Sequence, residues 1–357
     1  MEQSNTTLSN PESTSPLDNA VGNVQLAVFV ITFLVGSVGN ILVLIIVKGK
    51  RSRRSVNDLY IMNLAIADLM FIAFLPIYVY NWFVPAQMSV GMCKFIPPVM
   101  TMTYFLSVYT LTFMAVHRCY VILNPFKPDM RHRSVYISIA IIWIISAIFI
   151  MPLVVVGNAD KGMCTEDWPT KDHKRAYTLT LVILQYVLPL TIITVAYIRI
   201  IFDLNHGSAS KVERHTQVHQ QFRKENLQIV KTLATIVILF AVCLLPGQVC
   251  WMMVDFGSSN QKSLTIFFDA SVILSALHSC LNPIVYGTLT KQFRREYMRY
   301  FLYVFRCCRK RWGYRKHYTT GWNSHTTHSP QENNNKTETS QFIRTYALEP
   351  TVRESRV

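Results

Sequence analysis

The sequence predicts an all-α integral membrane protein, a bundle of seven transmembrane helices followed by a short amphipathic eighth helix. Seven apolar stretches alternate with short polar loops. Each is long enough to cross a hydrocarbon core about 30 Å thick at about 1.5 Å of rise per residue. The chain is also 51% apolar and only 15% charged, which is too apolar for a soluble domain of 357 residues. The stretches are Val24–Val47, Leu59–Tyr80, Phe95–Leu123, Val135–Val156, Tyr177–Phe202, Ile229–Val254 and Leu264–Leu289.

We expect a helix in every stretch, because a backbone amide in lipid must find its hydrogen-bond partner within the protein. Residues 24–289 then form the membrane domain, and residues 1–23 precede it as a disordered segment. Residues 290–306 carry apolar side chains at helical spacing with Lys and Arg between them. This pattern predicts a helix on the membrane surface. The polar residues 307–357 are predicted to be disordered.

Positive charge on alternate loops predicts the orientation. Residues 1–23 contain no Lys or Arg, whereas residues 48–54 and the C-terminal tail are basic. The positive-inside rule therefore places the N-terminus outside the cell and the C-terminus in the cytosol of a multi-pass plasma-membrane protein. The net charge of +15 then faces lipid head groups and cytosolic partners, so nucleic-acid binding is not expected. Asn5 begins an Asn-Thr-Thr sequon on the outer side and is a predicted glycosylation site.

Four cysteines carry predictions that depend on this orientation. Cys93, at the outer start of the third span, and Cys164, in the second outer loop, face the oxidising side. A disulfide between them is expected, and it would contribute a few kcal/mol. Cys307 and Cys308 follow the amphipathic stretch, which is the usual setting for palmitoylation.

Polar residues inside the spans leave two interpretations open. A charge at Asp68 would cost about 2.5–3.5 kcal/mol near the bilayer centre, so the residue is either a neutral, hydrogen-bonded acid or a cation or proton site. Arg118 lies at the cytosolic end of the third span, where a lone Arg commonly extends to the head groups. Pro246 and Pro283 interrupt the sixth and seventh spans. They predict simple kinks or the break points of a bundle that switches between packings.

Short motifs follow one another along the spans. They are Gly39-Asn40, Leu64-Ala65-Ile66-Ala67-Asp68, Cys93 followed by Arg118, Trp143, Pro189 with Tyr197, Phe240 with Pro246, and Asn282-Pro283-Ile284-Val285-Tyr286. Together they resemble the motifs of rhodopsin-like (class A) G-protein-coupled receptors. The resemblance covers about residues 24–305 and implies an outer ligand pocket and an inner cavity that opens to engage a heterotrimeric G protein.

The resemblance implies roles for individual residues. No cofactor is expected, but the resemblance implies a pocket at Asp68 for a sodium ion as an allosteric modulator. This sodium pocket would use Asp68, Ser107 and Asn282, with Asn40 nearby. The activation switch would comprise His117, Arg118, Tyr197, Phe240, Pro246, Pro283 and Tyr286. Phe126, in the second inner loop, would enter a groove on the G protein.

One departure from the family lies beside Arg118. The family usually has an acid before this arginine, but this chain has His117. The usual partner position at the foot of the sixth span corresponds to Asn226, and the adjacent Glu225 is an alternative. We expect higher basal signalling than in a His117→Asp variant, because the carboxylate that holds the arginine at rest is missing.

Other positions narrow the ligand class. Leu244 stands where the family commonly has a Trp, so ligand sensing is expected to pass through Phe240 and its neighbours. Residues 264–289 contain no Lys for a retinal Schiff base, which excludes light sensing. Met100 stands where monoamine receptors carry an Asp, which excludes an amine ligand of that type.

Two runs are informative about the ligand, Cys164-Thr165-Glu166-Asp167-Trp168-Pro169 in the second outer loop and Gln185-Tyr186-Val187-Leu188-Pro189-Leu190 in the fifth span. They resemble the corresponding parts of neuropeptide receptors of the RFamide and neuropeptide Y type. In those receptors an acid at the position of Asp255 pairs with an Arg near the amidated C-terminus of the peptide, so a basic amidated neuropeptide is the predicted ligand. Glu166 and Asp167 would add to a negative rim. The alternative for Asp255 is a solvated helix end. Met100 stands where those receptors often carry Gln, so the partner of the peptide amide is left unidentified.

Further residues are predicted to line the pocket by position, although aromatic side chains there are equally expected of core packing. They are Trp251, Gln248, Tyr104, Thr101, Met100, Trp82 and Phe268. A chemokine-like peptide receptor is the alternative function, indicated by Leu75-Pro76-Ile77 and His278-Ser279-Cys280. A transporter or channel is poorly supported because no inverted repeat is evident. Nothing predicts an enzyme.

The tail predicts cytosolic partners. Its Ser and Thr residues are expected substrates of receptor kinases, and the phosphorylated tail is expected to bind arrestin. Ser355–Val357 fits a PDZ ligand. The basic residues between Arg306 and Lys316 are expected to contact membrane lipid.

Overall fold

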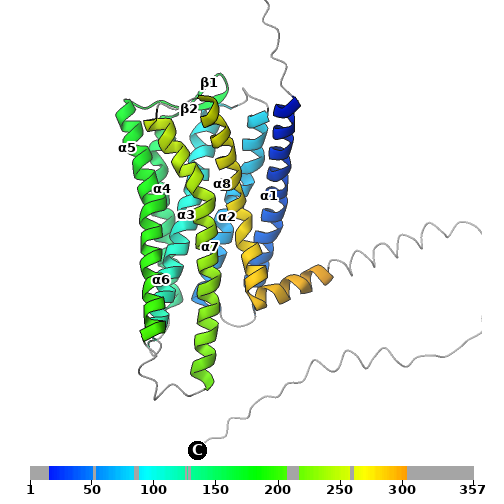
Figure 1. The fold of residues 1–357 in the computed structure, drawn as a ribbon, viewed down its shortest axis with the longest axis vertical. Helices are drawn as coiled ribbons and strands as arrows, with labels where there is room; N and C mark the ends of the chain where they lie inside the picture. Colours follow the sequence, from blue (N-terminus) through cyan, green and yellow to red (C-terminus); the bar gives the residue numbers. More distant parts are fainter. Residues whose placement is uncertain are drawn as a thin grey trace, which may run out of the picture. The chain divides into compact units, whose positions relative to one another are not determined.

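A computed structural model shows the seven predicted spans as seven helices that run side by side (Figure 1). It describes residues 16–50, 54–83, 88–124, 127, 130–206, 217–257 and 261–303. Within these residues, seven helical spans are long and apolar enough to cross a membrane. The predicted fold class is therefore confirmed. The spans are α1 (Pro16–Lys48), α2 (Val56–Phe83), α3 (Val90–Leu123), α4 (His132–Val156), the run of α5 (Lys171–Val182), η1 (Ile183–Val187) and α6 (Leu188–His206), α7 (Gln217–Phe256) and α8 (Gln261–Leu289).

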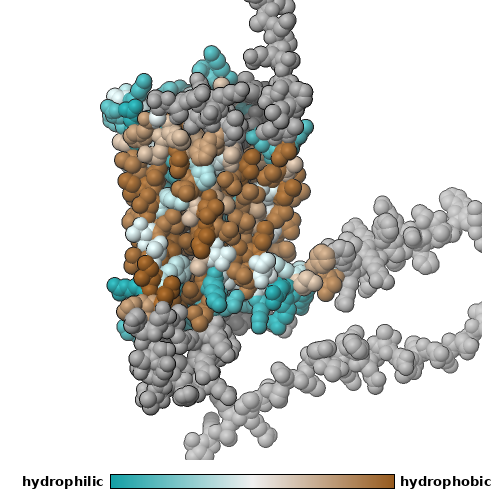
Figure 2. Space-filling view, in the orientation of Figure 1, coloured by the Kyte–Doolittle hydropathy of each residue, from teal (hydrophilic) through white to brown (hydrophobic). Residues whose placement is uncertain are grey.

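Apolar side chains face outward around the bundle. Figure 2 shows a brown band across its mid-height, with hydrophilic residues toward both ends. Helix α4 is the clearest case, since Ile144 and Ile148 are each 60% exposed and Val155 is 70% exposed. Such a surface is stable only against hydrocarbon. By contrast, α3 buries Phe105, Leu106 and many neighbours and forms the centre of the bundle.

The fifth span contains a π-helical turn, η1, just before Pro189. Proline has no N–H group, so the carbonyl of Gln185 four residues earlier cannot receive its normal helical hydrogen bond. The backbone widens instead, and the N–H of Leu188 donates to the carbonyl of Ile183, five residues back. Such turns re-aim side chains and are frequent at functional sites. Here Gln185 lies inside the bundle and is 4% exposed.

The loop after α4 folds into a β-hairpin, which the sequence analysis did not predict. Strand β1 (Gly157–Asp160) pairs antiparallel with β2 (Met163–Glu166). Lys161 and Gly162 connect them with φ of 48° and 75°. Positive φ at both central residues is what a type I′ turn requires, and it matches the twist of the strands.

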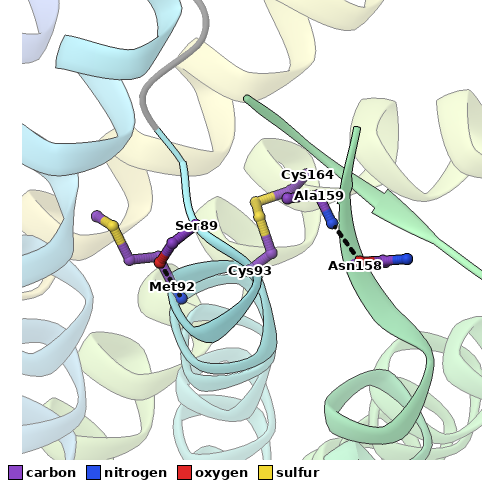
Figure 3. Close-up of a disulfide and its surroundings, with 6 residues drawn as sticks. All are labelled: Ser89, Met92, Cys93, Asn158, Ala159 and Cys164. Carbon is purple, nitrogen blue, oxygen red and sulfur yellow. Dashed lines mark hydrogen bonds between the residues drawn. A yellow bond between two sulfur atoms is a disulfide. The ribbon is translucent and has the colours of Figure 1, made fainter. Parts of the chain in front are cut away.

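The hairpin is attached to the start of α3 by the predicted disulfide between Cys93 and Cys164 (Figure 3). The two Cα atoms lie 5.2 Å apart, which is a normal separation for this bond. Cys164 pairs with Ala159 across the hairpin, so the disulfide fixes both strands over the bundle. We call this end of the bundle the disulfide end, and the opposite end of α3 the Arg118 end.

Residues 291–303 form the predicted amphipathic helix, the orange segment that turns away from the end of α8 in Figure 1. Phe293 is 3% exposed and stacks on Tyr286 of α8, with ring centroids 5.3 Å apart. The hydroxyl of Tyr297 donates to the carbonyl of Pro283, and burial raises the pKa of this phenol, so it stays a donor at neutral pH.

Several predicted sites lie outside the described residues and stay predictions. They are the glycosylation site Asn5, the G-protein contact Phe126, the palmitoylation sites Cys307 and Cys308, the kinase and arrestin sites of the tail, and the PDZ ligand Ser355–Val357. The side chain of Trp82 is likewise not described.

Candidate ligand-binding site and switch residues

A cavity of about 310 Å³ opens at the disulfide end and is lined mainly by apolar side chains. Eight of the ten predicted ligand-binding residues line it, although they come from four different elements. Those eight are Met100, Thr101 and Tyr104 of α3, Glu166 of β2, Gln248, Trp251 and Asp255 of α7, and Phe268 of α8. Trp251 and Phe268 lie edge to face, with centroids 5.8 Å apart.

Asp255 is not a solvated helix end. Its carboxylate is 3% exposed and lies 3.0 Å from the ammonium of Lys174. The hydroxyl of Thr178 donates to its other oxygen at 2.5 Å. The Nε of Arg175 donates to its backbone carbonyl at 2.9 Å. These contacts tie the end of α7 to α5 with an ion pair that borders the cavity.

The other two predicted acids have different surroundings. Glu166 lines the cavity and accepts a hydrogen bond from the indole N–H of Trp168 at 2.7 Å. Asp167 does not line the cavity; it accepts from the Nδ2 of Asn158 across the hairpin. Among the described residues that line the cavity, the charged ones are the acids Glu166 and Asp255 and the base Lys174. Within this described lining, two negative charges against one positive charge leave a negative balance.

A short chain of amides crosses the wall of the same cavity. The Nε2 of Gln185 donates to the backbone carbonyl of Thr101 at 3.2 Å. The Nε2 of Gln248 donates to the Oε1 of Gln185 at 3.3 Å. Both glutamines line the cavity, and the chain links α3, η1 and α7.

Below the cavity, His278 of α8 lies among three aromatic rings. Its imidazole centroid is 5.1 Å from Tyr104, 5.4 Å from Phe71 and 5.8 Å from Phe240. Leu244 is buried in the same core as Phe240. Because it is a leucine, it adds no aromatic ring to this group. His278 thus joins the cavity residue Tyr104 to Phe240, a contact that the sequence analysis missed. The available signal was a histidine inside the seventh span.

The predicted sodium pocket lies in a fully buried polar core. Asp68 is 0% exposed, and its Oδ2 accepts from the Nδ2 of Asn282 at 2.7 Å. In the described part of the chain, the Oδ1 of Asp68 and the Oγ of Ser107 are buried without a hydrogen-bond partner. Unpartnered carboxylate and hydroxyl oxygens suit a hard cation. Asn40 instead donates to the carbonyls of Gly36 and Ser279. Sodium binding stays a prediction.

At the Arg118 end, the guanidinium does not extend to the surface. Arg118 is 7% exposed, and its Nη1 donates to the Oδ1 of Asn226 at 3.3 Å. His117 is 4% exposed beside it. The hydroxyls of Tyr197 and Tyr286 are buried without a partner among the described residues. The remaining predicted switch positions, Phe240 and the two prolines Pro246 and Pro283, lie within α7 and α8 between the two ends.

Comparison with known proteins gives one family. The family described as "7 transmembrane receptor (rhodopsin family)" matches residues 39–286. The galanin receptor type 1 of Mus musculus is 29% identical over 310 residues, which cover 83% of this chain and 86% of that receptor. The neuropeptide FF receptor 1 of Rattus norvegicus is 29% identical over 305 residues, covering 79% and 71%. The G-protein coupled receptor 54 of Oreochromis niloticus is 28% identical over 295 residues, covering 78% of each chain. Because the family match spans more than half of the chain, this protein belongs to the rhodopsin family of seven-transmembrane receptors, a family of receptors rather than enzymes.

Proposed function

We propose that the chain is a receptor for an extracellular, basic, C-terminally amidated peptide, and that it transmits binding to a heterotrimeric G protein. The observation that carries the proposal is the cavity at the disulfide end, whose mainly apolar lining includes the acids Asp255 and Glu166 and the aromatic pair Trp251 and Phe268. Galanin and neuropeptide FF receptors are similar over most of the chain, and their names indicate peptide ligands.

The negative balance of the cavity favours a cationic ligand. An arginine guanidinium can bind a carboxylate through two parallel hydrogen bonds, and it is more weakly hydrated than an ammonium. It can therefore compete with Lys174 for Asp255, where the present ion pair is a single contact of 3.0 Å. Glu166 provides a second acid in the lining of the cavity. Aromatic residues next to the arginine would pack against Trp251 and Phe268.

The proposed orientation places the disulfide end outside the cell. Disulfides persist in oxidising compartments, and Cys93–Cys164 lies at this end. The start of α1 lies at the same end in Figure 1. The absence of Lys and Arg from residues 1–23 agrees with an extracellular N-terminus.

Transmission would run along α7, because this one helix carries residues of both ends. Asp255 lies about 44 Å along the helix from Asn226, at about 1.5 Å per residue. Between them lie Phe240, which contacts His278, and Pro246, which interrupts the backbone hydrogen bonding. A ligand that changes the partner of Asp255 would move the α5–α7 contact and bias the Arg118–Asn226 contact. An element with two states whose equilibrium both sites bias is the physical basis of such coupling.

The test compares paired peptides on the full chain. Cells expressing it are screened with amidated peptides that contain arginine near the C-terminus and with analogues lacking that arginine, using calcium and cyclic-nucleotide readouts. We expect Asp255→Ala to weaken the arginine peptide by about 100-fold, since a charge-assisted pair is lost, and to change the analogue little.

Asp172→Ala is the matched control, because Asp172 lies on α5 near the same end with a side chain that is 92% exposed. It should leave both peptides unaffected. Equal losses for both peptides in Asp255→Ala would contradict the arginine pairing, and no response to any amidated basic peptide would contradict the proposed ligand class.

A further inference from the structure

We infer that Gln185 and Gln248 form the subsite that receives the primary carboxamide at the C-terminus of the peptide. The assignment rests on the function proposed above and adds the recognition that Met100 cannot provide. Met100 lines the cavity next to Thr101, but its thioether is only a weak hydrogen-bond acceptor. The two glutamines line the same cavity.

The backbone fixes the direction of the hydrogen bonds. The carbonyl of Thr101 can only accept, so the group of Gln185 that faces it must be the NH2, as the 3.2 Å contact has it. The carbonyl of Gln185 then points the other way and can only accept, so Gln248 must turn its own NH2 toward it, at 3.3 Å. The backbone carbonyl of Thr101 therefore fixes which atom of each side-chain amide is the oxygen and which is the nitrogen.

Gln185 is held rigidly in this place. The π-helical turn before Pro189 directs it into the bundle, where it is 4% exposed. A buried amide is stable there only because both ends of the group are hydrogen-bonded. Gln248 is therefore positioned by a group that cannot rotate freely, which lowers the entropic cost of binding.

The hydrogen-bonding groups of Gln248 that face the cavity determine which end group of the peptide fits. Across the described residues, the Oε1 of Gln248 accepts no hydrogen bond, and Gln248 borders the cavity. Gln248 therefore offers an acceptor, and its second N–H offers a donor. A primary carboxamide has the complementary donor and acceptor. A carboxylate has no donor and would bring its charge against the Oε1 oxygen, so the free acid of the same peptide should bind more weakly.

Arginine and amide recognition then use different parts of one cavity. Asp255 lies seven residues, about two helical turns, from Gln248 on α7, so the acid is nearer the end of the helix and the amide group is deeper. A peptide that enters C-terminus first would place its carboxamide at the glutamines and an arginine close to the end at Asp255.

The experiment measures binding of one probe pair to membranes containing the full chain. The probe is a peptide ending in Arg-Phe-amide, compared with its free acid. We expect the unchanged receptor to prefer the amide, and Gln248→Leu to remove about tenfold or more of the affinity for the amide while changing the acid little. Gln185→Leu should have the same effect, because Gln248 then loses the hydrogen bond that positions its amide. Gln228→Leu is the matched control: it lies on the same helix at the Arg118 end, where its amide donates to Leu289.

The ratio of the two affinities is measured on each variant, so a fall in folded receptor lowers both signals without changing the ratio. If both cavity variants bind the peptides with an unchanged preference for the amide, the subsite is wrong while the proposed function stands. Equal binding of amide and acid by the unchanged receptor overturns the subsite and the amidated part of the proposed ligand class, while the recognition of a basic peptide stands. Failure to bind any amidated basic peptide overturns the proposed function and the subsite together.

Discussion

The two ends of the bundle hold their buried charges in different ways. At the disulfide end, the carboxylate of Asp255 lies 3.0 Å from the ammonium of Lys174 and accepts a hydrogen bond from Thr178, beside a cavity. At the Arg118 end, the guanidinium of Arg118 donates to Asn226, a neutral amide, at 3.3 Å. One contact joins opposite full charges, whereas the other joins a charge to a dipole.

The difference indicates how the two ends would respond to a ligand. Separating opposite charges in a poorly solvated site is costly, so the disulfide end changes most easily by exchanging one cation for another. A hydrogen bond from a charged donor to a neutral amide contributes about 1.5–3 kcal/mol. A peptide arginine that replaces Lys174 would therefore act on the Arg118–Asn226 contact through α7.

The largest expected effect is that of removing the disulfide that attaches the hairpin to α3. Cys93→Ser should lower the free energy of unfolding by about 2–5 kcal/mol, because the hairpin is no longer tied to α3. Thermal denaturation in detergent measures the change. The double variant Cys93→Ser/Cys164→Ser should match the single one. Cys119→Ser, at the Arg118 end and not in a disulfide, serves as control. Additive losses in the double variant would contradict a shared bond.

A smaller effect is expected when Lys174 no longer competes with a peptide arginine for Asp255. Peptide affinity should rise, whereas Asp255→Ala should lower it. Lys174→Met removes the resident partner of Asp255 and leaves the carboxylate for the ligand. The affinity for an arginine-containing amidated peptide should rise by about tenfold, or about 1.4 kcal/mol, while an analogue without arginine changes little. Competition binding measures both. A loss of affinity for the arginine peptide would show that Lys174 does not compete with it.

The smallest expected effect tests the Arg118 end. Asn226→Asp and His117→Asp each place a carboxylate near Arg118, and each should lower ligand-free second-messenger levels by a few-fold, about 1 kcal/mol. Asn226→Leu removes the amide acceptor and should raise them. Thr235→Val, on the same helix with a hydroxyl that donates to the carbonyl of Lys231, is the control. Equal basal levels in all variants would mean that the Arg118–Asn226 contact does not restrain the resting state.

Much of the fold was predictable from the sequence because lipid imposes a local requirement. A helix that crosses a membrane must be apolar over its own length, so the seven spans could be predicted without knowing their neighbours. The amphipathic helix after α8 and the pairing of Cys93 with Cys164 followed from spacing and compartment. The hairpin was missed because Gly157–Glu166 has no alternation of apolar and polar residues, although Lys161-Gly162 was a usable turn signal.

The sequence by itself determined which residues lie in the membrane and which end of each span they occupy, because hydropathy and charge act along the chain. Only the tertiary structure decided which partners meet. Lys174 and Asp255 are far apart in sequence, as are Gln185 and Thr101, and His278 and Phe240. Their contacts depend on the rotation of each helix about its axis and on the π-helical turn before Pro189. These features arise from packing between helices, which no single span encodes.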